Sequence, residues 1–388
     1  MADTLQAKKI TAAFRRHTRR TLRVHIIAAA IVLLCFCSCQ SPGEPGPEEP
    51  PEFEFAEPFN WQTATPLSVG LDTAFIASAT REFHARQSLF SFLIVKDGKL
   101  IVEEYNIPFT KFHDYDIRSA SKSFISALVG IAVREGVIDS LRQRVLDLLP
   151  GYRSSGMDPR KNNITVEHLL TMRAGFDYNE GDDYSHLFTP TADWTKTIID
   201  LPLKFTPGER FSYATIQTHL LSVIIAKRSG MSTLAFANKY LFKPLSIGVR
   251  AWYKDPQGNY YGGTGMSFTA RDLARFGALY LHNGALDGQQ IVPGSWVNES
   301  LKPRNVTGSF WGSFPNVNYG YSWWMQFGAQ DSVFMAAGYA GQFIMNIPRY
   351  NMTIVTTANS DIAPSASDAQ FNSIIDIVAQ YVLPAARH

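Results

Sequence analysis

A serine and a lysine three positions apart, Ser119 and Lys122, have the types and spacing that could carry a reaction. A serine hydroxyl becomes a nucleophile only when a neighbouring base takes its proton. If Ser119 begins a helix, Lys122 lies one turn later on the same face, within reach of that hydroxyl. A lysine can act as the base when burial or another cation lowers its pKa. The pair alone is also compatible with a serine N-cap followed by a surface lysine.

Two further candidate parts of the same site are a tyrosine and a glycine-containing segment at a predicted strand. Tyr213 follows a proline–glycine turn at the start of a long helical pattern, where its hydroxyl could share a proton with Lys122. The segment Ala336–Gln342 contains Gly338 and Gly341, and glycines in a strand indicate that a ligand approaches the backbone closely. Taken singly, the tyrosine is also typical of core packing, and the glycines of a β-bulge.

The segments that must position these residues predict one sheet built from distant parts of the chain. Asp97-Gly98 between two apolar runs predicts a hairpin of Leu89–Val95 and Leu100–Tyr105. Apolar residues at helical spacing predict a buried helix directly after Ser119. Other predicted helices cover 72–86, 166–172, 216–228, 232–241, 269–282 and 365–383, and other predicted strands cover 319–326, 333–337, 342–347 and 352–358. Strands at both ends with a helical middle predict an α+β fold with an inserted helical block.

In their order along the chain, Ser119 with Lys122, then Tyr213, then the Gly338 strand resemble the serine β-lactamase and penicillin-binding-protein superfamily. The chain is most similar to its class C branch, with the related esterases and 6-aminohexanoate-dimer hydrolases. Further segments that match this branch are Glu167–Phe176, Gly263–Met266, Thr269–Gly277 and Tyr319–Trp324. The resemblance runs from about residue 71 to residue 383. It implies an antiparallel sheet flanked by helices, an all-helical lobe, and an active site between them.

Residue by residue, the resemblance implies catalysis through an acyl-enzyme. Ser119 would be the acylated nucleophile, and Lys122 and Tyr213 would form the proton-transfer pair. The backbone N–H groups of Ser119 and Tyr339 would form an oxyanion hole, which is usually the largest electrostatic contribution to acyl transfer. The residues implied to contact the substrate are Thr215, Gly338, Tyr339 and Gly341. The resemblance implies no metal and no cofactor.

Two positions depart from the superfamily pattern and change the expected substrate. Thr215 stands where the Tyr-x-Asn motif has asparagine, and Ala336-Ala337-Gly338 replaces a Lys-Thr-Gly or His-Thr-Gly triplet, so this strand supplies no cation. A cation there helps to hold a substrate carboxylate, a charge-assisted contact worth about 1.5–3 kcal/mol. We therefore expect hydrolysis of an ester or a small amide. The alternatives are a D,D-peptidase or β-lactamase acting on cell-wall peptides or β-lactams, and a non-catalytic descendant that binds peptides.

Composition and charge argue against several other classes of protein. Hydrophobic residues make up 45% of the chain and charged residues 18%, which is typical of a globular domain and excludes a disordered chain. Residues 1–38 hold seven basic residues and one acidic residue, which leaves 29 basic and 33 acidic residues, a net charge of −4, in the remainder. A nucleic-acid partner is therefore not expected. The sequence has no His-Glu-x-x-His or His-x-His motif that would indicate a metal site.

The amino terminus has the pattern of a bacterial lipoprotein signal. A basic region precedes the 11-residue apolar run Ile26–Phe36, which is shorter than the roughly 20 residues that span a bilayer. Phe36-Cys37-Ser38-Cys39 resembles a lipobox in which Cys39 is lipidated, although an uncleaved signal anchor would give the same topology. We predict a signal segment at 1–39, a Pro/Gly/Glu-rich linker at 40–60 and one hydrolase domain at 61–388. The domain would then lie in the cell envelope, outside the cytoplasm, attached to the membrane by a lipid anchor.

Overall fold

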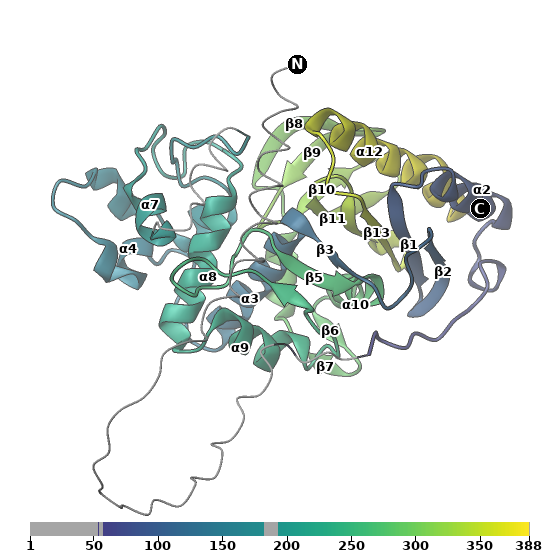
Figure 1. Ribbon diagram of the computed structural model, residues 1–388, viewed down its shortest axis with the longest axis horizontal. Helices are drawn as coiled ribbons and strands as arrows, with labels where there is room; N and C mark the ends of the chain where they lie inside the picture. The colour runs from purple at the N-terminus through teal and green to yellow at the C-terminus, as the bar shows by residue number, and fades with distance from the viewer. Residues whose placement is uncertain (1–52, 54–56, 182–192, 388) are drawn as a thin grey trace, which may run out of the picture. The chain divides into compact units, whose positions relative to one another are not determined.

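An antiparallel eight-stranded sheet is the centre of the computed structural model, which describes Phe53, residues 57–181 and residues 193–387 (Figure 1). The strand order is β2-β1-β13-β12-β11-β10-β9-β8. The strands are β1 (Leu89–Lys96), β2 (Lys99–Tyr105), β8 (Asn305–Trp311), β9 (Phe314–Tyr319), β10 (Trp324–Phe327), β11 (Ser332–Gly338), β12 (Gln342–Ile347) and β13 (Met352–Ala358). Because β1 pairs with β13, the predicted sheet of distant segments is confirmed. The predicted signal segment 1–39, with Cys39, and residues 40–52 and 54–56 of the predicted linker lie outside the described residues.

Side chains alternate between two cores along the central strands. In β1, Phe92 and Ile94 point into one core, whereas Leu93 and Val95 point into the other, as expected for a strand covered on both faces. The predicted β1–β2 hairpin is confirmed with its turn at Asp97-Gly98.

Helices cover both faces of the sheet. Helices α2 (Thr73–His84) and α12 (Pro364–Ile377) lie over one face, and α3 (Ser121–Arg134) and α10 (Ala270–Leu281) lie over the other (Figure 1). Each of α2 and α10 begins where a polar side chain caps it. Asp72 accepts hydrogen bonds from the first turn of α2, and Thr269 accepts one from the first turn of α10. The antiparallel sheet flanked by helices is therefore confirmed.

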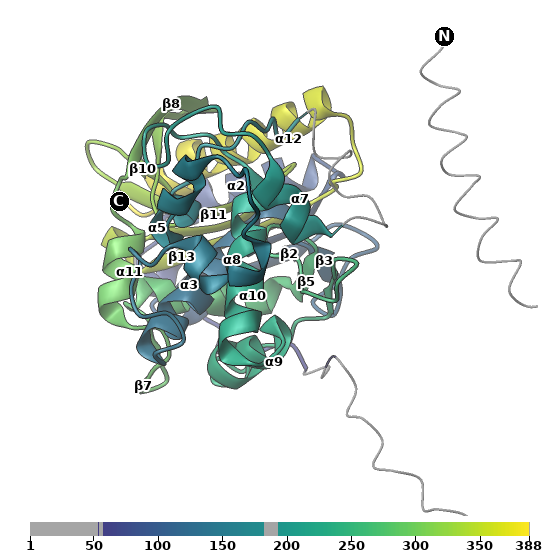
Figure 2. The same ribbon diagram turned by 90° about the vertical axis from the view of Figure 1, so that its left-hand side faces the viewer.

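A helical lobe stands beside the sheet (Figures 1 and 2). Its helices are α4 (Val145–Leu148), α5 (Val166–Leu170), α7 (Trp194–Asp200), α8 (Thr215–Ser229) and α9 (Thr233–Ala237). Helix α8 is buried over most of its length and packs against both α3 and α5, so it joins the lobe to the helix that carries Lys122. Within the described residues, no single helix passes a length-and-hydropathy test for a membrane span, although the bent pair Thr215–Ser229 and Thr233–Phe242 passes it jointly.

Two local predictions are wrong, and one small sheet was not predicted. The segment 319–326 is not one strand: β9 ends at Tyr319, β10 begins at Trp324, and the turn between them is held by hydrogen bonds of Ser322 to α3 and α5 residues. A small sheet of β3 (Asp114–Asp116), β5 (Met266–Thr269) and β4 (Ala251–Trp252) was not predicted. Ser119 does not begin the α-helix but lies in the 3₁₀ turn Arg118–Ala120 before it.

Candidate active site

Ser119 and Lys122 lie within hydrogen-bond distance at the start of α3. Lys122 Nζ is 2.9 Å from Ser119 Oγ. The preceding turn is set by Arg118, whose φ is +50° and whose backbone N–H donates to Asp116 Oδ1 at 2.9 Å. This backbone conformation is uncommon for a residue with a side chain, and it brings the serine over the first turn of the helix. The prediction that the two side chains meet is confirmed.

Lys122 is buried, with 2% of its surface exposed. Besides Ser119, its Nζ contacts two oxygens: Thr215 Oγ1 at 2.9 Å and the Gly263 carbonyl at 2.8 Å. Burial lowers the pKa of Lys122 to about 8, and the negative charge of Glu180 opposes this shift. About a tenth of Lys122 is therefore a neutral amine at pH 7, and about half at pH 8. The neutral amine is the form that can take a proton from a serine.

Tyr213 completes the predicted trio. Its ring centroid lies 5.0 Å from Lys122 Nζ, and Trp324 and Tyr319 pack against the ring at 5.6 and 6.1 Å between centroids. Burial raises the pKa of Tyr213 well above its usual value, and a hydrogen bond with Ser119 opposes that effect. Tyr213 is therefore a neutral phenol, able to donate a proton beside the serine, and the structure brings all three predicted side chains together.

Glu180 is a charged residue of this site that the sequence pattern does not reveal. Its carboxylate accepts the backbone N–H of Thr215 at 2.7 Å through Oε2, and the Thr215 hydroxyl donates to Oε1. Thr215 is the first residue of α8, and the N-cap residue Ala214 offers no side-chain acceptor. Glu180 therefore occupies the place of an N-cap from another part of the chain, where a carboxylate is favoured. Glu180 lies in a turn after α5, and no sequence motif includes it.

The loop that carries the Gly263 carbonyl is held by a buried histidine and aspartate. His219 on α8 pairs with Asp255 Oδ2 at 3.2 Å, and the Gly262 N–H donates to His219 Nδ1 at 3.4 Å. His219 is thus packed within α8, and the loop of Gly262 and Gly263 reaches Lys122. Among the described residues, no group of three or more His, Cys, Asp or Glu side chains could hold a metal ion.

A cavity of about 590 Å³ opens onto Ser119. Its lining is Arg118, Ser119, Glu180, Gly181, Tyr213, Thr215, Thr264, Trp311, Trp324, Ala337, Gly338, Tyr339, Ser360, Pro364 and Phe371. The lining thus combines residues of the helical lobe with residues of the sheet, which is where the resemblance implies the active site. One wall is aromatic, because Trp311 packs against Trp324 and Phe371 with ring centroids 4.6 and 4.9 Å apart.

Of the residues near the end of β11 that are predicted to contact the substrate, two line the cavity and one does not. Gly338 and Tyr339 line the cavity, but a Cβ on Gly338 would lie 2.3 Å from the Ile117 carbonyl, so close packing of two backbones already requires glycine there. Gly341 is not among the described residues that line the cavity. Its φ is +98°, and a Cβ would lie 2.2 Å from Ile374 Cδ1 on α12, which accounts for its glycine.

Trp324 and Trp194 have different surroundings. Trp324 lines the cavity. Trp194 instead packs against His219 and Tyr261, with ring centroids 5.8 and 5.5 Å apart.

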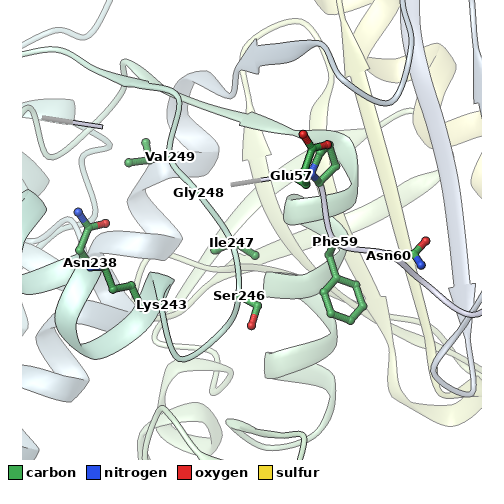
Figure 3. Close-up of a pocket in the computed structure, with 10 residues that line it drawn as sticks. Glu57, Phe59, Asn60, Asn238, Lys243, Ser246, Ile247, Gly248 and Val249 are labelled. Carbon is green, nitrogen blue, oxygen red and sulfur yellow. The ribbon is translucent and has the colours of Figure 1, made fainter. Parts of the chain in front are cut away.

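Figure 3 shows a second cavity, whose volume is about 450 Å³. It is bounded by residues 57–60, residues 246–249, Asn238 and Lys243. None of the described residues that line it belongs to the Ser119 site.

Comparisons with known proteins agree with the fold. The Beta-lactamase family model matches residues 77–377. A 6-aminohexanoate-dimer hydrolase of Paenarthrobacter ureafaciens is 27% identical over 285 residues, covering 68% of this chain and 71% of the relative. The structure is similar to that of an octameric penicillin-binding protein homologue from Pyrococcus abyssi (TM-score 0.61, 22% identity, 80% of this chain and 77% of the other). It is also similar to a D-stereospecific amidohydrolase from Streptomyces (TM-score 0.60, 18% identity, 77% and 97%).

The family match spans both walls of the cavity, from α2 through Ser119 and Tyr213 to α12. With Ser119, Lys122 and Tyr213 brought together in this fold, the chain belongs to the Beta-lactamase family, whose members are generally serine hydrolases.

Proposed function

We propose that this protein is a serine hydrolase that acts through an acyl-enzyme on an ester or a small amide. The observation that carries the proposal is the 2.9 Å contact between Ser119 Oγ and Lys122 Nζ, made inside the fold at the base of a cavity. Burial supplies what a lysine base requires, because it lowers the pKa of Lys122 to about 8.

In this mechanism, Ser119 Oγ bonds to the carbonyl carbon of the substrate while its proton passes to Lys122. The backbone N–H groups of Ser119 and Tyr339 stabilise the negative charge on the carbonyl oxygen. The bond to the leaving group then breaks, and the leaving group takes a proton from Tyr213 or Lys122. Water then attacks the carbonyl carbon of the acyl group and gives a proton to Lys122. The bond between that carbon and Ser119 Oγ breaks, Ser119 Oγ takes the proton, and the acid is released.

The cavity lining favours a substrate that places no free carboxylate beside strand β11. Strand β11 offers Ala336-Ala337-Gly338 and so no cation. Arg118 lines the cavity, but it is already paired with Asp361 at 3.2 Å and Asp116 at 3.5 Å. The aromatic wall instead suits an apolar acyl or leaving group.

Replacement of the nucleophile tests the proposal directly. Ser119→Ala is expected to abolish hydrolysis of p-nitrophenyl esters, and to abolish labelling by a fluorophosphonate probe, because the other hydroxyl in contact with Lys122, that of Thr215, donates its proton to Glu180. The far-ultraviolet circular dichroism and urea midpoint report that the fold is intact. Undiminished hydrolysis by the Ser119→Ala protein would remove Ser119 from the mechanism.

A D,D-peptidase or β-lactamase activity is the second candidate, and Arg118 is the feature that favours it. The guanidinium lies on the cavity beside Ser119 and donates to Ser360 Oγ at 2.9 Å, where a substrate carboxylate could displace its present partners. A labelled penicillin separates the two candidates. Stable labelling that is lost in Ser119→Ala supports the second candidate over an esterase.

We also propose that the domain lies outside the cytoplasm, attached to a membrane through lipidated Cys39. The lipobox-like sequence and the following Pro/Gly/Glu-rich segment support this proposal.

A further inference from the structure

Lys122 Nζ has three hydrogen-bond neighbours: Ser119 Oγ, Thr215 Oγ1 and the Gly263 carbonyl. A neutral amine has two N–H donors and one lone pair, so exactly one of these neighbours can donate to it. The Gly263 carbonyl is an acceptor only and must take an N–H. The remaining choice is between two hydroxyls. Catalysis requires that the lone pair face Ser119, which leaves the second N–H for Thr215.

The structure shows what decides between the two hydroxyls. The Thr215 hydroxyl proton is directed at Glu180 Oε1, while Glu180 Oε2 accepts the Thr215 backbone N–H at 2.7 Å. A carboxylate only accepts hydrogen bonds, so it fixes the direction of the Thr215 hydroxyl proton. Thr215 Oγ1 then has only lone pairs to offer Lys122. Thr215 is 1% exposed, so bulk water cannot substitute for Glu180 at this hydroxyl.

We propose that Glu180 is a positioning residue for hydrolysis: by accepting the Thr215 hydroxyl proton, it directs the lone pair of neutral Lys122 at Ser119. This inference rests on the proposed function, because it assigns Glu180 a part in activating the same serine. Glu180 acts through Thr215 and not on the reacting atoms.

Glutamine at position 180 cannot reproduce this arrangement. If its amide oxygen accepts the Thr215 N–H, its NH₂ group points at Thr215 Oγ1 and donates to it. The Thr215 hydroxyl proton is then free to turn toward the Lys122 lone pair and compete with Ser119. If the amide is turned over, its NH₂ group faces the Thr215 N–H, and two donors oppose each other.

The charge of Glu180 has a second, separable effect on Lys122. Of the described groups around this lysine, Glu180 carries the negative charge that raises its pKa, and Tyr213 is a neutral phenol. Arg118 on the same cavity is paired with Asp116 and Asp361. Removing the Glu180 charge therefore lowers the pKa of Lys122 further. A positioning role thus predicts lower reactivity of Ser119 together with a pH dependence moved to lower pH.

The test measures the rate at which a fluorophosphonate labels Ser119 as a function of pH. In this reaction Ser119 Oγ bonds to phosphorus, the P–F bond breaks, fluoride leaves and the serine proton passes to Lys122. Glu180→Gln is expected to lower the plateau rate about tenfold, the factor of one hydrogen bond of ordinary net strength, and to move the rising limb to lower pH. Glu57→Gln is the matched control, because Glu57 is an exposed glutamate at the other cavity. Its profile is expected to match that of the unaltered protein.

A double-mutant cycle with Thr215→Val shows whether Glu180 acts through the threonine hydroxyl. Valine has the shape of threonine but no hydroxyl, so there is no proton left for Glu180 to direct. In the Thr215→Val protein, the added Glu180→Gln change is expected to alter the plateau rate less than about twofold. The rising part of the rate–pH profile still moves to lower pH, because the charge of Glu180 acts on Lys122 through space.

Two results would overturn the inference. They are an unchanged plateau rate in Glu180→Gln, and a tenfold effect of Glu180→Gln that persists in the Thr215→Val background. The last result would mean that Glu180 acts on the reagent or on the fold and not through Thr215. Labelling that survives in Ser119→Ala would instead overturn the proposed function itself.

Discussion

At the scale of single residues, the site depends on a lysine that the fold has removed from water. Lys122 is placed among oxygens, with 2% of its surface exposed, and its pKa is lowered to about 8 by burial. The pKa of Tyr213 moves in the opposite direction: burial disfavours the phenolate and so raises this pKa. One environment therefore favours the neutral form of both groups, and gives a base and an acid in contact with Ser119.

The pH dependence of hydrolysis follows from the lowered pKa of Lys122. The amine must be neutral to take the Ser119 proton, so kcat/KM for a p-nitrophenyl ester is expected to rise with pH and to level off above its pKa of about 8. Below that value the rate should fall about tenfold per pH unit. Rates measured from about pH 6 to about pH 10, with Ser119→Ala as the blank, check this. A rate that does not change across this range would contradict a lysine base.

The sequence alone was sufficient to find the residues that are marked by type and spacing. Ser119, Lys122 and Tyr213 were predicted to meet, and they do. Glu180 was not predicted, because its position depends on where one loop lies relative to the first turn of α8. Such a contact between distant segments has no periodicity or motif in the sequence. The direction of the Thr215 hydroxyl follows from that contact, so it could not be predicted from the sequence either.

At the scale of elements, helix α10 lies so close to the sheet that Gly277 has no room for a side chain. A Cβ on Gly277 would lie 2.4 Å from Thr353 Cγ2 on β13 and 2.7 Å from Ile344 Cγ2 on β12. Thr269 caps α10 at one end, and β12 and β13 are buried on both faces. Contact across this interface holds the helix against the middle of the sheet.

Gly277→Val is expected to lower the free energy of unfolding by about 1–3 kcal/mol, the usual cost of forcing extra methyl groups into a packed core. Urea denaturation measures the change. Gly151→Val is the control, because Gly151 is exposed and a Cβ there meets nothing within 4 Å. Equal stability losses in the two variants would show that close packing at Gly277 is not the cause.

The elements that were predicted correctly are those with a strong local pattern. Strands β12 and β13 match their predicted bounds because each is a short apolar run closed by turn residues. The predicted strand 319–326 failed because aromatic residues continue through a turn. Ser322 has a φ of +58° there, and its backbone is bonded to Leu170 and Ser123. Contacts with other segments fix that turn, so local propensity could not reveal it.

At the scale of the whole molecule, the proposed anchor would hold a hydrolase close to a membrane surface. The predicted order is a lipidated Cys39, a linker at 40–60 and the domain at 61–388. A Pro/Gly/Glu-rich linker favours an extended, solvated chain. We therefore expect the catalytic domain to work beside the membrane without entering it.

Cys39→Ala is expected to abolish incorporation of labelled palmitate and to move the protein from the membrane fraction to the soluble fraction. Hydrolysis per molecule should not change, because the substitution leaves the Ser119 site untouched. The matched control is Cys37→Ala, which removes a cysteine from the same segment but leaves Cys39. Equal palmitate incorporation in the Cys39→Ala protein and the unaltered protein would exclude Cys39 as the lipidation site.

The pairing of β1 with β13 determines when this protein can finish folding. Strand β1 ends at residue 96 and its partner begins at residue 352, so more than half the chain is synthesised between them. While the ribosome makes that stretch, the edge of β1 that will meet β13 has no native partner and is open to pairing with other chains. A holdase chaperone that covers this edge during synthesis would therefore increase the yield of native protein far more than it would stabilise the finished molecule.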